Sequence, residues 1–279
     1  YSAVLAILVL LLFLICYNNG RKAKFISEIE AEEANVQVEE EEAVPFKEAM
    51  GMLMKNKYWL IVVAFNLITS ITSAVAASSG SYYCKWIFGN DNLVGITGAV
   101  GMLSTVVGFL VSKPIISKLG VKRTINLGLI GAAVSAAVRC FAPTNFMVYV
   151  VTGLVGSFIQ IPLMCLYGVL LAMAVDYNEW KYDKKLVAVS SGAIGFGSKV
   201  GNGLGTLLLS LFLMVGAYDA SAAIATSSMR FSIYGFSNYL PVVINLVMFL
   251  IFTGFDLEEK LPKMRQEIEE RRAKKEVTK

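Results

Sequence analysis

The sequence predicts an all-α membrane protein, and three observations lead to this prediction. Apolar residues make up 56% of the 279 residues, whereas charged residues make up only 16%. Nearly all of the charged residues lie in a few short clusters. The segments between the clusters are apolar and close in length to the ~20 residues that a helix needs to cross a bilayer. This balance favours burial in lipid over a soluble core with a solvated surface.

Seven apolar segments are long enough, or nearly so, to cross a membrane. Hydropathy places them at residues 1–17, 58–79, 93–113, 124–142, 146–172, 188–215 and 233–255. The first segment is short, starts at Tyr1 without an initiator Met, and has its positive residues after the apolar run, which disfavours a secretory signal. We therefore expect it to be the remainder of a longer helix, in an N-terminally truncated piece of a larger transporter-like protein.

Lysine and arginine residues cluster in every second gap between the apolar segments. Because cytoplasmic loops collect these residues, the alternation predicts a multi-pass protein of the cell (cytoplasmic or inner) membrane with a cytoplasmic C-terminus. In this orientation all but four of the 25 Lys and Arg residues lie on the cytoplasmic side. The four exceptions are Lys85, Arg139, Lys199 and Arg230.

The segments outside the membrane complete the domain organisation. We expect the end of a transmembrane helix at 1–17, a cytoplasmic central loop at 18–57, a six-helix transmembrane bundle at 58–255 and a cytoplasmic tail at 256–279. In the central loop, eight Glu residues between Glu28 and Glu42 indicate a solvated linker, after which Pro45 can start a short interfacial helix. Opposite charges at helical spacing, such as Glu267 and Arg271, predict a solvated helix in the tail.

The composition also excludes several classes of site. The chain has no histidine, and its four cysteines have neither CxxC nor other metal-ligand spacing, so we expect no metal site, no cofactor and no histidine-based catalytic triad. The net charge of +4 comes from the cytoplasmic loops and does not indicate nucleic-acid binding. Cys84 and Cys140 are both expected near the outer face, where a disulfide is an open alternative. An enzyme is not predicted.

Lys199 is the most informative residue inside a predicted span. An ionisable side chain near the bilayer centre costs at least ~2.5 kcal/mol, so its position needs a reason. On a helix it shares a face with Gly195, Asn202 and Thr206, whereas the opposite face carries Gly197, Gly201 and Gly205. We expect the glycine face to pack against a neighbouring helix and the Lys199 face to line a polar cavity. A structural alternative is that Lys199 holds two helices together through a carboxylate, but the last six spans contain no Asp or Glu.

Other polar residues within the spans have two open interpretations. Asn66, Ser70 and Ser73 are expected on one face of their span, and Gln160 lies in another. They could bind a polyhydroxy ligand or form interhelical hydrogen bonds. Arg139 lies near the outer end of its span, where we expect it to extend toward the interface. We also expect the helices to kink at the two prolines within spans, Pro162 and Pro241.

The segment Asp176–Lys181, with the sequence DYNEWK, precedes the span that holds Lys199. This arrangement resembles the glycoside-pentoside-hexuronide:cation symporters, which include the melibiose carriers and carry such a signature in the loop between helices ten and eleven. The resemblance implies a major-facilitator fold of twelve helices in two halves. This chain would be the C-terminal six-helix half plus the end of helix six.

The resemblance also implies roles for residues. Lys199 matches a lysine of helix eleven that links cation and sugar binding, while the cation ligands and principal sugar-binding acids are Asp residues of the N-terminal half. The segment Lys113–Arg123 is similar to a degenerate second copy of the major-facilitator loop motif, with Ser117 where the stronger copy has Asp. The residues implied in gating loops are Asp176, Tyr177, Glu179, Trp180, Lys181, Gly120, Lys122 and Arg123. Gly195 stands where melibiose carriers have a polar side chain, which leaves the sugar open.

The predicted function is symport of a sugar or glycoside with a monovalent cation, Na+ or H+, by alternating access. The candidate substrate and coupling residues are Lys199, Asn202, Thr206, Gly195, Asn66, Ser70 and Gln160. The expected partners are the sugar, the cation and the lipid bilayer, and the full-length protein is expected to be a monomer. One alternative is a carrier of a lipid or another amphiphile, and an alternative of another class is a seven-helix receptor or scaffold.

Overall fold

The computed structural model describes residues 9–11, 13–15, 17 and 44–277. The described residues before position 18 are helical, whereas most of the predicted central loop, with its Glu run, lies outside the described residues. The chain divides into two compact units, Tyr1–Val44 and Pro45–Lys279.

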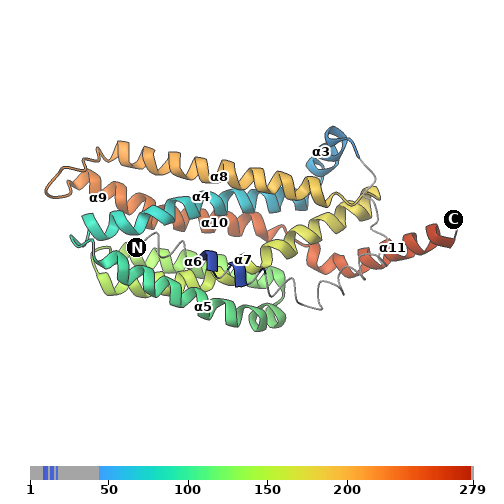
Figure 1. Ribbon diagram of the computed structural model, residues 1–279, viewed down its shortest axis with the longest axis horizontal. Coiled ribbons are helices and arrows are strands. Elements are labelled where there is room, and N and C mark those ends of the chain that lie inside the picture. Colours follow the sequence, from blue (N-terminus) through green and yellow to red (C-terminus); the bar gives the residue numbers. More distant parts are fainter. Residues whose placement is uncertain (1–8, 12, 16, 18–43, 278–279) are drawn as a thin grey trace. The chain divides into compact units, whose positions relative to one another are not determined.

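The second unit is a bundle of long helices (Figure 1). Within the described residues, six helices are long and apolar enough to cross a membrane. They are α4 (Lys57–Trp86), α5 (Leu93–Leu119), α6 (Val121–Phe141), α7 (Phe146–Tyr182), α8 (Val187–Val215) and the run Ser227–Thr253, which consists of α9 (Ser227–Tyr234), the π-helical turn η1 (Gly235–Tyr239) and α10 (Leu240–Thr253). Each lies over one of the last six predicted apolar segments, which confirms the all-α, multi-pass membrane fold.

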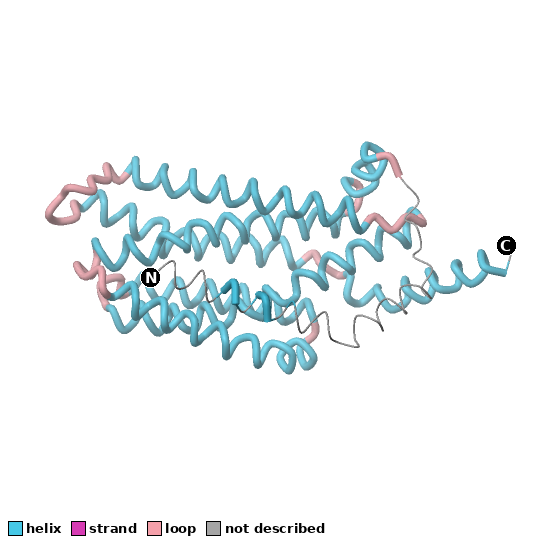
Figure 2. Tube along the Cα trace, viewed as in Figure 1, coloured by secondary structure: helices cyan, strands magenta, loops and turns pink. Residues whose placement is uncertain are grey.

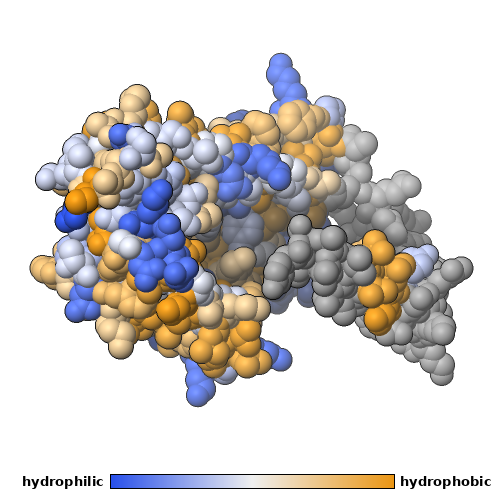
Figure 3. All heavy atoms as spheres, turned by 60° about the vertical axis from the view of Figure 1, so that its left-hand side comes forward, coloured by the Kyte–Doolittle hydropathy of each residue, from blue (hydrophilic) through white to orange (hydrophobic). Residues whose placement is uncertain are grey.

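The helices run between two ends, where the loops gather (Figure 2). We call them the α9 end, which includes the loop between α8 and α9, and the α11 end, where α4 and α6 begin, α7 ends and α11 (Leu257–Val277) starts. α8 packs along α4, α5 and α6 pack against α7, and α10 packs against α6. Viewed from its α9 end, the bundle shows patches of hydrophilic residues among hydrophobic ones (Figure 3).

A short helix precedes the bundle, as the sequence predicts. α3 (Phe46–Met54) begins directly after Pro45 and buries Ala49 and Leu53, whereas Phe46 is 67% exposed. Asn56 then starts α4, because its side-chain oxygen accepts hydrogen bonds from the backbone N–H groups of Tyr58 and Trp59. Its amide nitrogen donates to the Ala174 carbonyl at 2.9 Å, which fixes the start of α4 against α7.

The glycine face of α8 lies against α4, as the sequence predicts. A Cβ atom on Gly201 would lie 2.7 Å from the Leu67 carbonyl oxygen, and one on Gly205 would lie 2.6 Å from the Ile71 carbonyl oxygen. Only a residue without a side chain allows two helix backbones to approach this closely. The packing therefore sets which face of α8 points away from α4.

The last membrane-spanning helix is interrupted by a π turn just before Pro241. Proline has no N–H group, so the Ser237 carbonyl cannot accept the usual helical hydrogen bond from position 241. The turn η1 includes this carbonyl, and its wider register pairs the N–H of Leu240 with the carbonyl of Gly235. By contrast, α7 continues through Pro162 as one helix of 37 residues.

Candidate functional site

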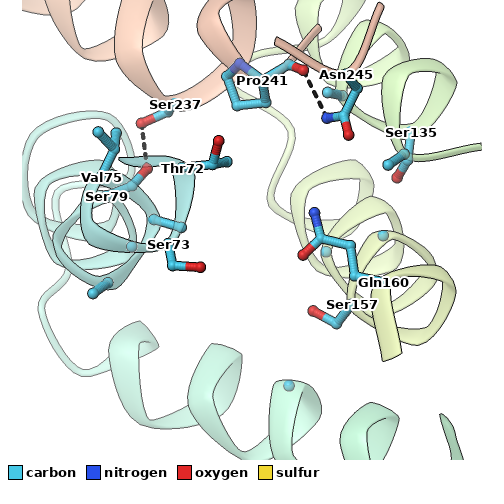
Figure 4. A pocket seen from close by; sticks show the side chains of 18 of the residues that line it. Thr72, Ser73, Val75, Ser79, Ser135, Ser157, Gln160, Ser237, Pro241 and Asn245 are labelled. Carbon is cyan, nitrogen blue, oxygen red and sulfur yellow. Dashed lines mark hydrogen bonds between the residues drawn. The ribbon is translucent and has the colours of Figure 1, made fainter. Parts of the chain in front are cut away.

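A pocket of about 790 Å³ lies between α4, α5, α6, α7 and the η1–α10 segment. Its wall is largely apolar, with hydroxyl and amide groups projecting from four of these elements into a shared space (Figure 4). Among the described residues that line it, Arg139 alone is charged. The pocket therefore offers many neutral hydrogen-bonding groups and one positive charge.

The α4 wall carries its polar groups at helical spacing. Thr69, Thr72 and Ser73 follow Asn66 by three to seven positions, so they lie on neighbouring faces of the helix. Farther along α4, the hydroxyl of Ser79 lies 2.6 Å from that of Ser237, which joins α4 to the π turn across the pocket wall (Figure 4). The two hydroxyls satisfy each other within an apolar surrounding.

The opposite wall is supplied mainly by α7 and α10. The side chains of Ser157 and Gln160 extend from α7 toward the space that faces α4 (Figure 4). The hydroxyl of Tyr167 is buried and has no hydrogen-bond partner among the described residues. Asn245 donates one hydrogen bond to the Pro241 carbonyl at 2.7 Å. The polar groups of this wall that face the open space are therefore those of Ser157 and Gln160.

Arg139 lines the pocket and lies two residues before the end of α6. Its guanidinium carbon lies 4.5 Å from the ring centroid of Tyr149, and its Nε donates to the Thr152 hydroxyl at 3.1 Å. Both partners belong to α7, which packs against α6 along most of its length. The cation–π contact and the hydrogen bond hold the guanidinium against the first two turns of α7.

The structure divides the predicted substrate residues between two places. Asn66 and Gln160 line the pocket, and the Asn66 side-chain oxygen also accepts a hydrogen bond from Ser198 at 2.9 Å. Ser70 does not line it, because its Cβ lies 2.8 Å from the position that a Cβ on Gly201 would occupy, on the side of α4 that faces α8. The expected face of Asn66, Ser70 and Ser73 is therefore split between pocket and helix contact.

The remaining candidates lie on the exposed face of α8. Lys199, Gly195, Asn202 and Thr206 are all exposed within the second unit and do not line the pocket. The reason is geometric: the glycine face docks on α4, so the opposite face points away from it. The Thr206 hydroxyl donates to the Asn202 carbonyl at 3.0 Å, and Lys199 has no ion pair with any described residue.

At the α11 end, the DYNEWK segment forms the last turns of α7 and is not a loop. The helix continues to Tyr182 and ends at Asp183, whose φ is 55°. In helical conformation the segment presents its acidic residues to α11. Asp176 accepts two hydrogen bonds from Arg265, at 2.8 and 2.6 Å, and Glu179 accepts two from Arg272, at 3.0 and 2.6 Å.

Aromatic and neutral groups complete this contact between α7 and α11. The Trp180 indole N–H donates to Glu267 at 2.6 Å, and Arg271 donates to the Trp180 carbonyl at 2.8 Å. The helix predicted for the tail is confirmed as α11: one side, with Glu267 and Arg271, binds α7, and most of its other residues are exposed. Lys181 lies over the Tyr177 ring at 5.9 Å from its centroid.

The predicted loop Lys113–Arg123 is almost entirely helical. Only Gly120 separates α5 from α6, and its φ of 77° is a conformation that favours glycine. Glu258 of α11 accepts hydrogen bonds from the backbone N–H groups of Val121 at 2.7 Å and Lys122 at 2.8 Å. The carboxylate thus caps the N-terminus of α6, where both the free N–H groups and the helix dipole favour a negative charge. Arg123 is exposed.

A third contact joins α11 to the start of α4. The hydroxyl of Tyr58 donates to Asp256 at 2.6 Å, and the Lys260 ammonium binds the other oxygen of the same carboxylate. These hydrogen bonds, from Lys260 first and Tyr58 second, hold the pKa of Asp256 well below its usual range. The same carboxylate raises the pKa of Lys260. The segment from Asp256 onward therefore binds α4, α6 and α7 at one end of the bundle.

Within the described part of the chain, no three His, Cys, Asp or Glu side chains come together as a metal centre would require. The thiols of Cys84 and Cys140 are free.

Comparison with known proteins decides the family. Residues 1–259 match the family described as MFS/sugar transport protein. The chain belongs to this family. Its relatives within this sugar-transport family include the isoprimeverose transporter of Lactiplantibacillus pentosus, which is 22% identical over 98% of this chain and 54% of its own length. An inner membrane symporter of Escherichia coli (strain K12) is 23% identical over 74% of this chain and 45% of its own length.

A putative glycoside/cation symporter of the same Escherichia coli strain is 20% identical over 75% of this chain and 46% of its own length. The chain therefore spans about half the length of these relatives. The match confirms the resemblance predicted from the sequence, and these relatives are named as transporters or symporters rather than as enzymes or receptors.

Several residues of the pocket and of the α11 end were not predicted from the sequence. Tyr167 and Asn245 line the pocket but stand singly in apolar sequence, and Ser237 is followed only by Asn238, so none of the three gives a periodic signal. Glu258 was not distinguished from its neighbours in a charged tail. The sequence does contain one signal for Arg139. Ser135, four positions earlier, is also polar, so the two residues share one face of the helix.

Proposed function

We propose that this chain forms the C-terminal half of a symporter that couples the transport of a sugar or glycoside to Na+ or H+ by alternating access. The observation that carries the proposal is the pocket, whose polar groups are neutral hydroxyls and amides apart from Arg139. Groups of this kind exchange hydrogen bonds with sugar hydroxyls in both directions, because each can act as donor or acceptor.

The size of the pocket agrees with such a ligand. Its volume of about 790 Å³ lies within the range of ~300–1,000 Å³ that small-molecule sites occupy. Gln160 and Asn66 are the groups that we assign to the sugar hydroxyls. The aromatic rings in the wall, such as Phe65 and Phe236, offer apolar surface to the faces of a sugar ring.

Lys199 has a different role in this proposal, because it points away from the pocket. We assign it to coupling: its ammonium pairs with acidic residues outside the six helices, and the pairing changes when a cation binds them. The six apolar spans carry no Asp or Glu that could serve as its partner. Asn202 and Thr206, on the same exposed face, lie beside it at the proposed contact. Gly195, one turn earlier, leaves room there.

The coupling of sugar transport to the cation then follows from thermodynamic linkage between the two binding events. Cation binding removes negative charge from the acidic site and favours the arrangement that binds sugar, so each ligand raises the affinity for the other. Only the doubly loaded or the empty carrier switches between its two open states. The carrier works as a monomer in the cell membrane, with the lipid bilayer around the exposed apolar faces.

We place the α11 end on the cytoplasmic side, because Lys and Arg gather there. Asp176, Tyr177, Glu179, Trp180 and Lys181 then belong to a cytoplasmic gate that α11 covers. Their neighbours across the bundle are Gly120, Lys122 and Arg123, the first two of which adjoin Glu258.

The test of this proposal is cation-driven accumulation in membrane vesicles that carry the native carrier. Lys199→Ala should abolish accumulation of labelled glycoside above the external concentration while leaving facilitated exchange measurable, whereas Val200→Ala, an exposed neighbour on α8, should have no effect. Full cation-coupled accumulation by Lys199→Ala would show that the assignment of Lys199 is wrong.

A further inference from the structure

Two of the four basic residues outside the predicted cytoplasmic side lie together at the α9 end. Lys85, in the last turn of α4, and Arg230, in α9, both line a groove of about 340 Å³ between the end of α4 and the loop before α9. Both residues are exposed, and neither forms an ion pair with a described residue. Because loops on the non-cytoplasmic side are normally poor in Lys and Arg, two such residues in one groove need a reason.

The groove carries a positive charge that its own lining does not neutralise, since no described acidic residue lines it. Asp91 and Asp219 lie in the neighbouring loops, but both are exposed, and Asp219 accepts its hydrogen bonds from Ser221. No described residue accepts a hydrogen bond from the backbone N–H groups of Ala223 and Ile224, which belong to the same lining. Ammonium, guanidinium and free backbone N–H groups are the donors that bind a phosphate.

An aromatic framework holds the two sides of the groove together. The Lys85 ammonium lies 4.8 Å from the ring centroid of Trp86. The Trp86 indole N–H donates to the Tyr218 hydroxyl at 3.2 Å, which joins the end of α4 to the loop before α9. Tyr82 packs edge-on against Tyr218, with ring centroids 5.5 Å apart. Because Trp and Tyr concentrate at the level of lipid headgroups, this framework places the groove at the membrane surface.

Exposed apolar side chains continue from the groove. Ile224, which lines it, is 74% exposed, and Phe231, directly after Arg230, is 68% exposed. The Phe231 ring lies beside the Tyr239 ring, with centroids 6.4 Å apart. A free phosphate ion would leave this apolar surface uncovered, whereas a phospholipid brings a phosphate to the basic residues and acyl chains to the apolar ones.

We propose that the groove lined by Lys85 and Arg230 binds the phosphate of an anionic phospholipid, such as phosphatidylglycerol, from the membrane leaflet at the α9 end. Arg230 supplies a planar set of donors for the phosphate oxygens, and Lys85 supplies a second positive charge. The two charges favour this lipid over phosphatidylcholine, whose headgroup carries a positive charge of its own. The groove shares no lining residue with the pocket described above, and the lipid site is independent of the proposed symport.

The test is hydrogen exchange, followed by mass spectrometry, on the native carrier in nanodiscs that contain phosphatidylcholine either alone or mixed with phosphatidylglycerol. Exchange is measured at Ala222–Ala225, which form one side of the groove. It should be at least about threefold slower with phosphatidylglycerol, which is the factor expected for a ligand at about twice its dissociation constant. Inorganic phosphate, added to phosphatidylcholine nanodiscs at matched ionic strength, should not slow it.

Variants separate the site from a general effect of surface charge. Lys85→Gln combined with Arg230→Gln should abolish the difference between the two lipids, while exchange in phosphatidylcholine stays at the native rate. Arg230→Lys should keep part of the difference, because it keeps the charge but loses the planar set of donors. The matched control is Lys55→Gln, which removes an exposed positive charge at the α11 end and should keep the full difference between the lipids.

Three results would overturn the lipid site: equal exchange of the native carrier in the two lipids, undiminished slowing by phosphatidylglycerol in the double variant, or slowing by inorganic phosphate as strong as that by phosphatidylglycerol. The last result would assign the groove to a soluble anion instead of a lipid. None of the three bears on sugar accumulation, so the lipid site and the proposed symport fail on different observations.

Discussion

The pocket and the α11 end use polar residues in opposite ways. In the pocket, hydroxyls and amides from several helices face an open space, and the single charged group has no charged partner among the described residues. At the α11 end, carboxylates and guanidinium groups pair directly with one another or cap a helix, as Asp176, Glu179 and Glu258 do. Polar groups without a protein partner can bind a ligand, whereas polar groups that are already paired within the protein form a structural contact.

The difference explains why charge alone is a poor guide to the site in this chain. Most charged residues lie at the α11 end and in the tail, where their partners belong to the same chain. The substrate-binding capacity that we propose depends on neutral groups. Substitutions in the pocket and at the α11 end test this difference, and their expected effects differ in size.

The largest effect is expected from Gly201→Leu, because both regions depend on the position of α4, which α8 fixes from the other side. The new side chain would meet the Leu67 carbonyl and the Ser70 Cβ at less than 3 Å, and backbone cannot yield. We expect a loss of about 3 kcal/mol or more in stability, visible as a lowered thermal unfolding temperature in detergent. Gly203→Leu, with nothing within 4 Å of its Cβ, is the matched control and should unfold as the native protein does.

The next effect concerns the pocket alone. Gln160→Leu replaces an amide in the pocket wall by an apolar group of similar size, so the fold should be retained while hydrogen bonds to the substrate are lost. We expect the apparent affinity for a transported glycoside to fall by about tenfold, without a change in unfolding temperature. Val151→Leu, at an exposed position of the same helix, serves as the control. Unchanged affinity in Gln160→Leu would mean that this wall does not contact the sugar.

A smaller effect should be confined to the α11 end. Glu258→Ala removes the carboxylate that accepts from Val121 and Lys122, and the loss of a helix cap costs about 1 kcal/mol. Hydrogen exchange at these two amides, followed by mass spectrometry, should become about fivefold faster, since 1.4 kcal/mol corresponds to a factor of ten. Glu259→Ala, its exposed neighbour, should leave the exchange unchanged. Equal exchange in the two variants would remove Glu258 from its capping role.

The smallest effect is expected from pH. The depressed pKa of Asp256 means that its contribution is complete above the unfolded value of ~3.9 and is lost only as the pH falls through the lower, folded value. The raised pKa of Lys260 means that its contribution is complete below ~10.4 and is lost as the pH rises through the higher, folded value. Proteolysis of the α11 segment, corrected for the intrinsic pH dependence of the protease, should therefore be constant from about pH 5 to about pH 9. A marked change in this window would assign the α11 contact to other groups.

The sequence predicts the fold well because lipid imposes a strong constraint on it. Apolar length and the spacing of charged clusters locate all six helices, and the glycine period of Gly197, Gly201 and Gly205 correctly predicts which face of α8 is packed. Helix ends are less accurate: the DYNEWK segment continues α7 because nothing in it stops a helix before Asp183. A hydropathy scan ends each helix at the first charges, whereas the backbone continues beyond the apolar core.

The candidate site could be predicted only in part. Asn66 and Gln160 line the pocket as expected, but Ser70 and Lys199 face elsewhere, because the rotation of each helix depends on neighbours that periodicity within one helix does not reveal. The pocket contacts of Arg139 were not predicted, because its partners Tyr149 and Thr152 lie on another helix. Contacts between helices decide these orientations.

The proposed cation-coupled symport is tested most directly by measuring the accumulation of a panel of labelled glycosides in vesicles that carry the native carrier. An imposed inward gradient of Na+ or H+ should raise the internal concentration of at least one of them above the external one, and an ionophore that collapses the gradient should reduce it to equilibrium. Transport that reaches only equilibrium with or without either gradient would contradict cation-coupled symport.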